Sequence, residues 1–203
     1  MTTDHLLQQI EFIKEIDKVK YILRRTKLFN SDRRENDAEH SWHLAVMAII
    51  LAEHSNEKID LLKVIKMLLI HDIVEIDAGD TFIYDTTKSH ENTDEERMAA
   101  QRIFGILPKQ QAQDLIDIWE EFEANVSAEA KFARSMDRLE PFLQNTSNDG
   151  GTWSEFDVPL SKVMEKKSVI RDGSTAVYDY VMETLEENVQ KGIIKDDTKK
   201  EEI

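Results

Sequence analysis

The sequence predicts a single all-α domain, on three observations. Only six glycines and three prolines occur in 203 residues, so breaks are few and the elements between them are long. No segment alternates apolar and polar residues over several positions, which is the pattern of a half-buried strand. Apolar residues recur instead at steps of three and four, as from Leu44 to Leu51, which is the spacing of one helix face. A chain of this length suffices for one domain with a sizeable core and is short for two.

Several residues that typically begin helices are present. Thr93 and Glu96 have the spacing of a capping box, and Asn36 with Glu39 is a weaker version. Pro108 is suited to the first turn of a helix. About seven or eight helices are therefore expected, over 4–27, 37–55, 60–76, 93–106, 109–124, 127–146, 159–168 and 173–190.

The remaining segments are predicted to lack regular structure. Residues 145–156 contain Asn-Asp-Gly-Gly and predict a loop. Pro141 predicts a kink in the expected helix over 127–146. The charged residues 195–203 predict a frayed tail, so the domain is assigned to 1–194 and the tail to 195–203.

Bulk properties narrow the function classes. A net charge of −15 repels phosphate backbones, so long nucleic acid is not an expected partner, whereas a small anion in a cationic pocket is allowed. No apolar run approaches the roughly 18 residues of a membrane span, and no secretory signal is evident. Cysteine is absent, which excludes disulfides and thiolate zinc sites. A cytoplasmic protein without a membrane contact is expected.

The adjacent His71 and Asp72 are the first chemical signal. They end a strongly apolar stretch that begins at Leu61, and an apolar helix that delivers two ionisable groups is costly unless something satisfies them. A divalent metal would do so, and imidazole with carboxylate suits Mn, Fe, Co, Ni, Cu or Zn, with Mg less favoured. An isolated His-Asp pair is more often a core histidine beside a cap or salt-bridge carboxylate.

Two further segments offer ligand-type residues. His40 lies at the start of a predicted helix, and Asp137 lies inside another, beside apolar neighbours such as Met136 and Leu139. Because Asp is a poor residue for a helix interior, a site that uses its carboxylate is indicated. His43 shares a helix face with His40, and its role stays open.

The order His…His-Asp…Asp is the signature of the HD superfamily. The runs Arg-Arg-Glu-Asn-Asp-Ala-Glu-His-Ser (33–41), His-Asp-Ile-Val-Glu-Ile-Asp-Ala-Gly-Asp (71–80) and Ser-Ala-Glu-Ala-Lys-Phe-Ala-Arg-Ser-Met-Asp (127–137) resemble the branch that contains the 5′-deoxynucleotidases and the human HD-domain-containing protein 2. The resemblance covers roughly residues 8–185. It implies a helical bundle with a central metal site, and a homodimer.

The resemblance also implies roles for individual residues. The metal ligands would be His40, His71, Asp72 and Asp137.

Glu75 matches the catalytic acid, and its spacing after His71 and Asp72 would place it on their face of a continuing helix. Arg25 matches the phosphate-contacting arginine, although its neighbour Arg24 differs by only one position in register.

Asp80 and Thr81, after Gly79, match a segment near the sugar. Thr26 departs from the pattern, because an aromatic residue follows that arginine in the bacterial deoxynucleotidases.

The expected reaction is hydrolysis of (deoxy)nucleoside 5′-monophosphates to nucleoside and phosphate, by attack of a metal-bound water. Asp72 would orient that water, and Glu75 would protonate the leaving 5′-oxygen, for which burial must raise its pKa. The alternatives are another HD-type phosphohydrolase, such as a cyclic nucleotide phosphodiesterase or an alarmone hydrolase, and a non-catalytic helical binding module. The matches at Arg25, Glu75 and Asp80 favour the monophosphatase, and the filled ligand positions argue against a binding module.

Overall fold

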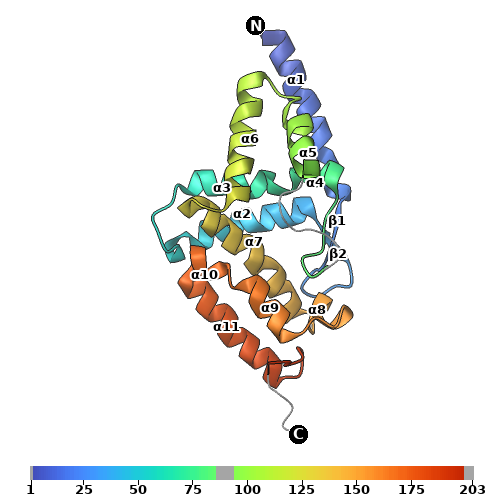
Figure 1. Ribbon diagram of the computed structural model, residues 1–203. Helices are drawn as coiled ribbons and strands as arrows, with labels where there is room; N and C mark the ends of the chain where they lie inside the picture. The colour runs from blue at the N-terminus through green and yellow to red at the C-terminus, as the bar shows by residue number, and fades with distance from the viewer. Residues whose placement is uncertain (1, 86–93, 199–203) are drawn as a thin grey trace.

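The computed structural model describes residues 2–85 and 94–198, which are predominantly helical (Figure 1). The predicted all-α class is confirmed. The helices are α1 (Thr2–Glu15), α2 (Asp37–Leu51), α3 (Leu61–Ile70), α4 (Glu75–Ala78), α5 (Asp94–Phe104), α6 (Lys109–Ala124), α7 (Ala128–Ser147), α8 (Gly151–Glu155), α9 (Leu160–Lys167), α10 (Ile170–Gly173) and α11 (Thr175–Gln190). Short 3-10 turns span Ile16–Tyr21, Ala52–His54 and His71–Val74.

The prediction of one helix over 4–27 was wrong after residue 15, and the chain that follows contains strands that were not predicted. α1 ends at Glu15, and after a 3-10 turn the chain forms β1 (Leu23–Lys27), which pairs antiparallel with β2 (Arg34–Asn36). β1 lacks the apolar/polar alternation of a half-buried strand because its inward positions are polar, with Thr26 buried and Arg24 partly buried. An apolar/polar pattern therefore could not reveal this hairpin.

Two further boundaries differ from the prediction. The expected helix over 60–76 is interrupted after Ile70 by the 3-10 turn, which changes the direction of the side chains that follow. The stretch 145–156, predicted as a loop, contains the end of α7 and the short helix α8. α7 continues through Pro141 to Ser147.

The predicted start of α2 is confirmed in detail. The backbone N–H of Glu39 donates to Asn36 Oδ1 over 3.0 Å, and the N–H of Asn36 donates to Glu39 Oε2 over 3.3 Å. α6 begins directly after Pro108, as expected. The capping box predicted from Thr93 lies outside the described residues.

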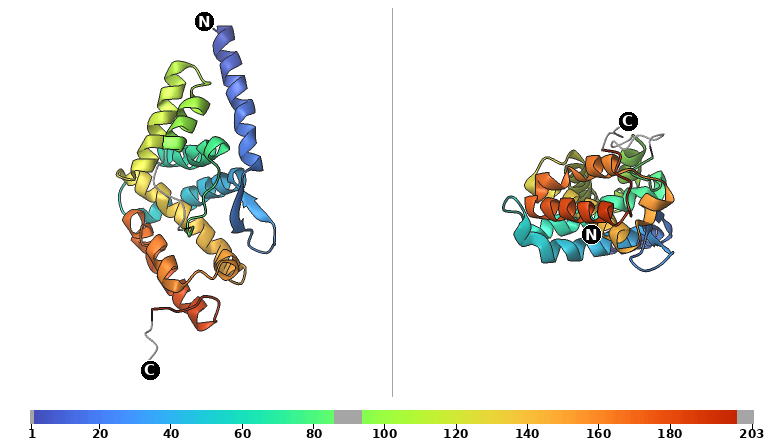
Figure 2. Two further views of the ribbon diagram at one scale, coloured as in Figure 1. Left: turned by 45° about the vertical axis from the view of Figure 1, so that its right-hand side comes forward. Right: turned by 90° about the horizontal axis from the view of Figure 1, so that it is seen from below.

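The elements form three layers along the molecule. α1, α5 and α6 lie at one end, α8 to α11 lie at the other, and α2, α3 and α7 lie between them (Figure 1). The turned view on the left of Figure 2 shows the same order, with α1 and α11 at opposite ends. One apolar cluster joins the central helices to α9, α10 and α11, and a second joins α1, α5 and α6 to the 3-10 turn after α3. Each fully buried Leu or Met contributes about 1.5–3 kcal/mol, and the central helices also bury polar residues, among them His40, Asp137 and Glu140.

The C-terminal end of the described chain is attached to α9. The N–H of Leu160 donates to the carbonyl of Lys195 over 3.0 Å, and the Ser161 N–H donates to Asp197 Oδ1 over 2.9 Å. Residues 199–203 lie outside the described residues, and the division of the chain at residue 194 stays a prediction. No helix among the described residues has both the length and the apolar composition to cross a bilayer.

Candidate metal centre

Three central elements deliver the predicted ligands into the interior. His40 lies in the second turn of α2 and is 0% exposed, because the face of α2 that carries Leu44 and Ala48 packs into the core. His71 and Asp72 follow α3 directly, and both are buried. Asp137 lies in the middle of α7 and is 4% exposed.

The four predicted ligand side chains converge. Nε2 of His40 lies 3.1 Å from Asp137 Oδ1 and 3.9 Å from Asp72 Oδ2. Nε2 of His71 lies 3.0 Å from Asp72 Oδ1 and 3.7 Å from Asp137 Oδ1. Residues that are 97 positions apart in the chain thus share one small volume.

Both imidazole rings turn Nε2 toward the carboxylates, because their Nδ1 atoms are held from behind. His71 Nδ1 lies 2.9 Å from the carbonyl of Leu68, so this nitrogen carries the proton and donates it. His40 Nδ1 lies 3.2 Å from Glu140 Oε2 and 3.4 Å from Glu35 Oε2. A carboxylate or carbonyl behind the ring is the usual partner of a metal-bound histidine.

The chemistry of this cluster fits a divalent transition metal. His71 Nε2 is buried and has no hydrogen-bond partner among the described residues, and such an atom is costly unless something satisfies its lone pair. His40, His71 and Asp72 can each point one donor atom at a single ion. Two imidazole nitrogens and two carboxylates are donors that suit such a metal.

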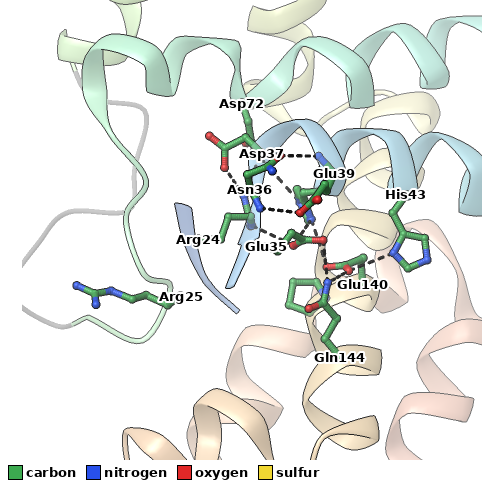
Figure 3. A network of polar contacts seen from close by, with 12 residues as sticks. Arg24, Arg25, Glu35, Asn36, Asp37, Glu39, His43, Asp72, Glu140 and Gln144 are labelled. Atoms are coloured by element: carbon green, nitrogen blue, oxygen red, sulfur yellow. Dashed lines mark hydrogen bonds and ion pairs between the residues drawn. The ribbon is translucent and has the colours of Figure 1, made fainter. Parts of the chain in front are cut away.

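Negative charge is concentrated around the site. Arg24 Nη1 lies 2.7 Å from Asp72 Oδ2 and 3.8 Å from Asp37 Oδ1, so one guanidinium faces several acids (Figure 3). Burial, followed by repulsion from Asp72, raises the pKa of Asp37 to about 8. Burial and the charges of Asp72 and Asp37 also raise the pKa of Glu75 well above its ordinary range. A bound cation would relieve this repulsion.

Asp137 behaves in the opposite way. Burial alone would raise its pKa, but the Arg138 guanidinium, at 2.9 Å from Asp137 Oδ2, is the largest of the influences that hold the pKa well below its usual range. This carboxylate is therefore charged at neutral pH, as a metal ligand must be.

A cavity of about 370 Å³ opens beside the cluster and brings together the predicted catalytic and substrate residues. Its volume lies within the range of small-molecule sites, about 300–1,000 Å³. Glu75, at the start of α4, lines it and has a buried Oε2 without a hydrogen-bond partner among the described residues. Asp80 and Thr81 line it after Gly79, whose φ of 75° gives the turn that ends α4.

Arg24 and Arg25 occupy different surroundings. Successive side chains of a strand point to opposite faces, so on β1 Arg24 enters the acid cluster while Arg25 is exposed and lies on the cavity wall. Figure 3 shows Arg25 extending away from the network. No hydrogen bond or ion pair joins its guanidinium to another described residue, so it is available to bind an anion there.

Several site residues were missed by the sequence analysis. Glu140 follows Asp137 by three positions and shares its helix face, which could have indicated it. Glu35 and Asp37 lie within the quoted run 33–41, close to His40. Lys167, on the cavity wall, carries no local signal.

His43 does not join the four predicted ligands. Its Nδ1 lies 3.2 Å from Glu140 Oε1, on the other oxygen of the carboxylate that holds His40.

Comparisons with known proteins identify the family of this chain. The family model described as "HD domain" matches residues 16–178. The chain is 29% identical to 5′-deoxynucleotidase HDDC2 of Homo sapiens over 136 residues, or 66% of this chain and 65% of that protein. The match therefore spans just under two thirds of the relative's length.

Solved structures are also similar. A crystal structure of a protein described as a predicted metal-dependent phosphohydrolase, from Magnetospirillum magnetotacticum MS-1, has a TM-score of 0.89 and 47% identity, and the match covers 95% of this chain and 96% of that one. A conserved hypothetical protein from Pyrococcus furiosus has a TM-score of 0.60 at 20% identity, over 89% of this chain and 99% of that one. This second likeness shows the fold alone.

Proposed function

This chain belongs to the HD domain family, and from that premise we propose that it hydrolyses nucleoside 5′-monophosphates, with a preference for 2′-deoxy forms. The observation that carries the proposal is the unsatisfied Nε2 of His71 among His40, Asp72 and Asp137, directly beside the cavity. The names of the relatives from Homo sapiens and Magnetospirillum magnetotacticum support the same reaction class.

The metal would be held by His40, His71, Asp72 and Asp137. A divalent ion in such a site would lower the pKa of a bound water toward about 7 and offset phosphoryl charge. The role of this chain's residues is to fix the donor atoms before binding, through Leu68 and Glu140 behind the two rings.

Arg25 would bind the phosphate. Its planar guanidinium can donate to two phosphate oxygens at once, and it lies on the cavity wall without an ion-pair partner among the described residues. Arg24 is less suited to this role, because its guanidinium is already bonded to Asp72. Its proposed function is to balance the charge of the acid cluster.

Glu75 and Asp72 would move and orient protons during hydrolysis. Water attacks phosphorus as the bond to the 5′-oxygen breaks, and the leaving oxygen takes the proton of Glu75 while the proton of the water passes to solvent. The proposal for Glu75 depends on its position on the cavity wall, with a buried and unbonded Oε2. Asp72, held by Arg24, would accept a hydrogen bond from the attacking water.

Asp80 and Thr81 would contact the sugar. Both lie on the wall of the cavity that Glu75 also lines, directly after the turn at Gly79. A carboxylate and a hydroxyl are suited to hydrogen bonds with sugar hydroxyls.

The test is release of inorganic phosphate from dAMP, dGMP, dCMP, TMP, the corresponding ribonucleotides and 3′-dAMP. Each would be assayed with Co²⁺, Mn²⁺, Mg²⁺ or a chelator. We expect release from the 5′-deoxy substrates that is lost with chelator and in Asp137→Ala, and retained in Asp114→Ala, which removes an exposed carboxylate of α6.

Lack of release from every monophosphate, by protein that retains bound metal, would refute the nucleotidase. Cyclic nucleotides and alarmones would then be assayed as substrates of the alternative HD-type phosphohydrolases. A protein that binds no metal would instead be a helical binding module.

A further inference from the structure

A cluster of cations lines the cavity wall beyond Asp137. Arg134 and Arg138 lie on α7, and Lys167 is the last residue of α9. We call these three residues the α7–α9 cation cluster. The proposed hydrolysis as described above uses none of them.

Lys167 is unusual among the lysines of this chain. Its side chain is buried at 3% exposure, and its Nζ donates to the carbonyl of Arg138 over 2.5 Å. No carboxylate lies within 4.0 Å of this Nζ among the described residues. An ammonium has three donors, so a buried and desolvated cation keeps donors available at the cavity wall.

The positive charges of the cluster are close enough to act on one another. Burial, followed by the charge of Arg138, lowers the pKa of Lys167 to about 7. Burial also lowers the pKa of Arg138, against the attraction of Asp137, and Arg134 lowers it further. Like charges in a desolvated site repel strongly, and an anion between them would remove that cost.

Contacts with neutral and aromatic groups fix the positions of the Tyr84 and Arg134 side chains. Tyr84 accepts a hydrogen bond from Trp153 Nε1 over 3.3 Å, so its own hydroxyl proton remains available to donate into the cavity. Arg134 donates to the carbonyl of Phe122 over 3.2 Å, and its guanidinium carbon lies 4.1 Å from the centre of the Phe122 ring. These donors are therefore positioned before a ligand arrives, which is the arrangement that favours tight binding.

We propose that Arg138, Lys167 and Tyr84 form an anion subsite beside Asp137 that binds a phosphate group. Arg138 and Lys167 supply the charge, and Tyr84 donates to an oxygen between them. Binding of inorganic phosphate at this subsite is independent of the proposed hydrolysis. Its use for the phosphoryl group of a nucleotide, in the cavity that Arg25 also lines, rests on the proposed function.

Lys167→Met is the most informative variant, because it keeps an unbranched side chain of similar length and removes only the ammonium. Tyr84→Phe removes the hydroxyl and keeps the ring. Lys162→Met is the matched control, since Lys162 is an exposed lysine on the same helix and changes the net charge equally. Arg138 is left intact, because it contacts Asp137.

Affinity for inorganic phosphate, dAMP and deoxyadenosine would be measured by isothermal titration calorimetry on the metal-loaded and the chelator-treated protein. Thermal unfolding would verify that each variant is folded. A hydrogen bond to a charged group contributes about 1.5–3 kcal/mol, which corresponds to roughly 10- to 100-fold in affinity. We expect a loss of that size for phosphate and dAMP in Lys167→Met, a smaller loss in Tyr84→Phe, and no loss in Lys162→Met or for deoxyadenosine.

Wild-type affinity for phosphate in folded Lys167→Met, or an equal loss in Lys162→Met, would overturn the subsite. So would the absence of phosphate binding by the wild-type protein. If phosphate binding depends on Lys167 while no monophosphate is hydrolysed, the subsite stands and the proposed function fails. If monophosphates are hydrolysed with unchanged KM in Lys167→Met, the proposed function stands and the use of the subsite for the phosphoryl group of a nucleotide fails.

Discussion

Glu140 Oε2 lies 3.2 Å from Nδ1 of His40, on the far side of the ring from Asp137. This contact fixes which nitrogen of His40 carries the proton, and it leaves Nε2 free for a metal. Glu140 is itself held by Gln144 and His43. The orientation of one proposed ligand thus depends on a carboxylate that need not touch the ion.

Glu140→Gln is expected to weaken metal binding by about 10- to 100-fold, because the amide keeps the shape and loses the charge behind His40. The dissociation constant would be measured by competition with a chelating dye. Glu165→Gln is the control, since Glu165 is an exposed carboxylate that pairs with the exposed Lys162. Equal affinity in Glu140→Gln and wild type would contradict the positioning role.

Arg24→Met and Arg25→Met are expected to change the free energy of unfolding by very different amounts. Arg24→Met leaves the buried Asp72 and Asp37 without their guanidinium, so in the presence of chelator the free energy of unfolding should fall by about 3–5 kcal/mol. Arg25→Met changes an exposed side chain and should stay within about 0.5 kcal/mol. Denaturant unfolding of both variants measures this difference.

Addition of a divalent metal should restore part of the stability lost in Arg24→Met, because the metal ion then supplies the positive charge that the acid cluster has lost. The corresponding gain in Arg25→Met should equal that of the wild type. Equal destabilisation by the two substitutions would show that Arg24 does not neutralise the cluster.

Lys167→Met is expected to stabilise the protein in phosphate-free buffer below pH 7, by about 1–4 kcal/mol, because a buried charge is removed. The pKa of Lys167 is about 7 in the folded protein and near 10.5 in the unfolded chain, so the unfolded chain binds more protons between these values. Wild-type stability therefore rises with pH through that window, and the advantage of the variant should shrink. Urea unfolding across this pH range tests the prediction, and a pH-independent difference would contradict it.

Tyr84→Phe removes the acceptor of the Trp153 hydrogen bond at every pH, but it is expected to change the pH dependence of stability only at alkaline pH. Burial raises the pKa of Tyr84 from 10.0 to about 12. The unfolded chain loses this proton first, so the wild type loses stability as pH rises through that interval, by roughly 3 kcal/mol at most. The variant should lack this loss, as measured by unfolding and by the ultraviolet absorbance of tyrosinate. Parallel curves for the two proteins would show that Tyr84 is not desolvated.

Much of the fold could be predicted because long helices carry their own periodic signal. α2, α6 and α7 were found to within a few residues at the start, helped by Asn36 and Pro108. The hairpin of β1 and β2 was not, since Arg24 and Thr26 occupy its inward positions and no apolar alternation exists there. The break after Ile70 was also missed, because it depends on how the turn packs against α5 and not on a local Gly or Pro.

The candidate site was predictable only in the part that the order of His and Asp residues encodes. His40, His71, Asp72 and Asp137 were predicted, and the structure brings them together, although their role as ligands stays a prediction. Whether Arg24 or Arg25 faces the acids depended on a strand that had been expected as a helix. Lys167 could not be found, because its burial results from the contact of α9 with α7.

The distance along the chain between His40 and Asp137 has a mechanical consequence. A bridge between these residues closes a loop of 97 positions, and cross-links of long loops restrict the unfolded chain most. An ion bound at this point would act as a removable cross-link through the centre of the molecule. Chelation should then accelerate unfolding and proteolysis of the whole domain together, instead of loosening one surface segment.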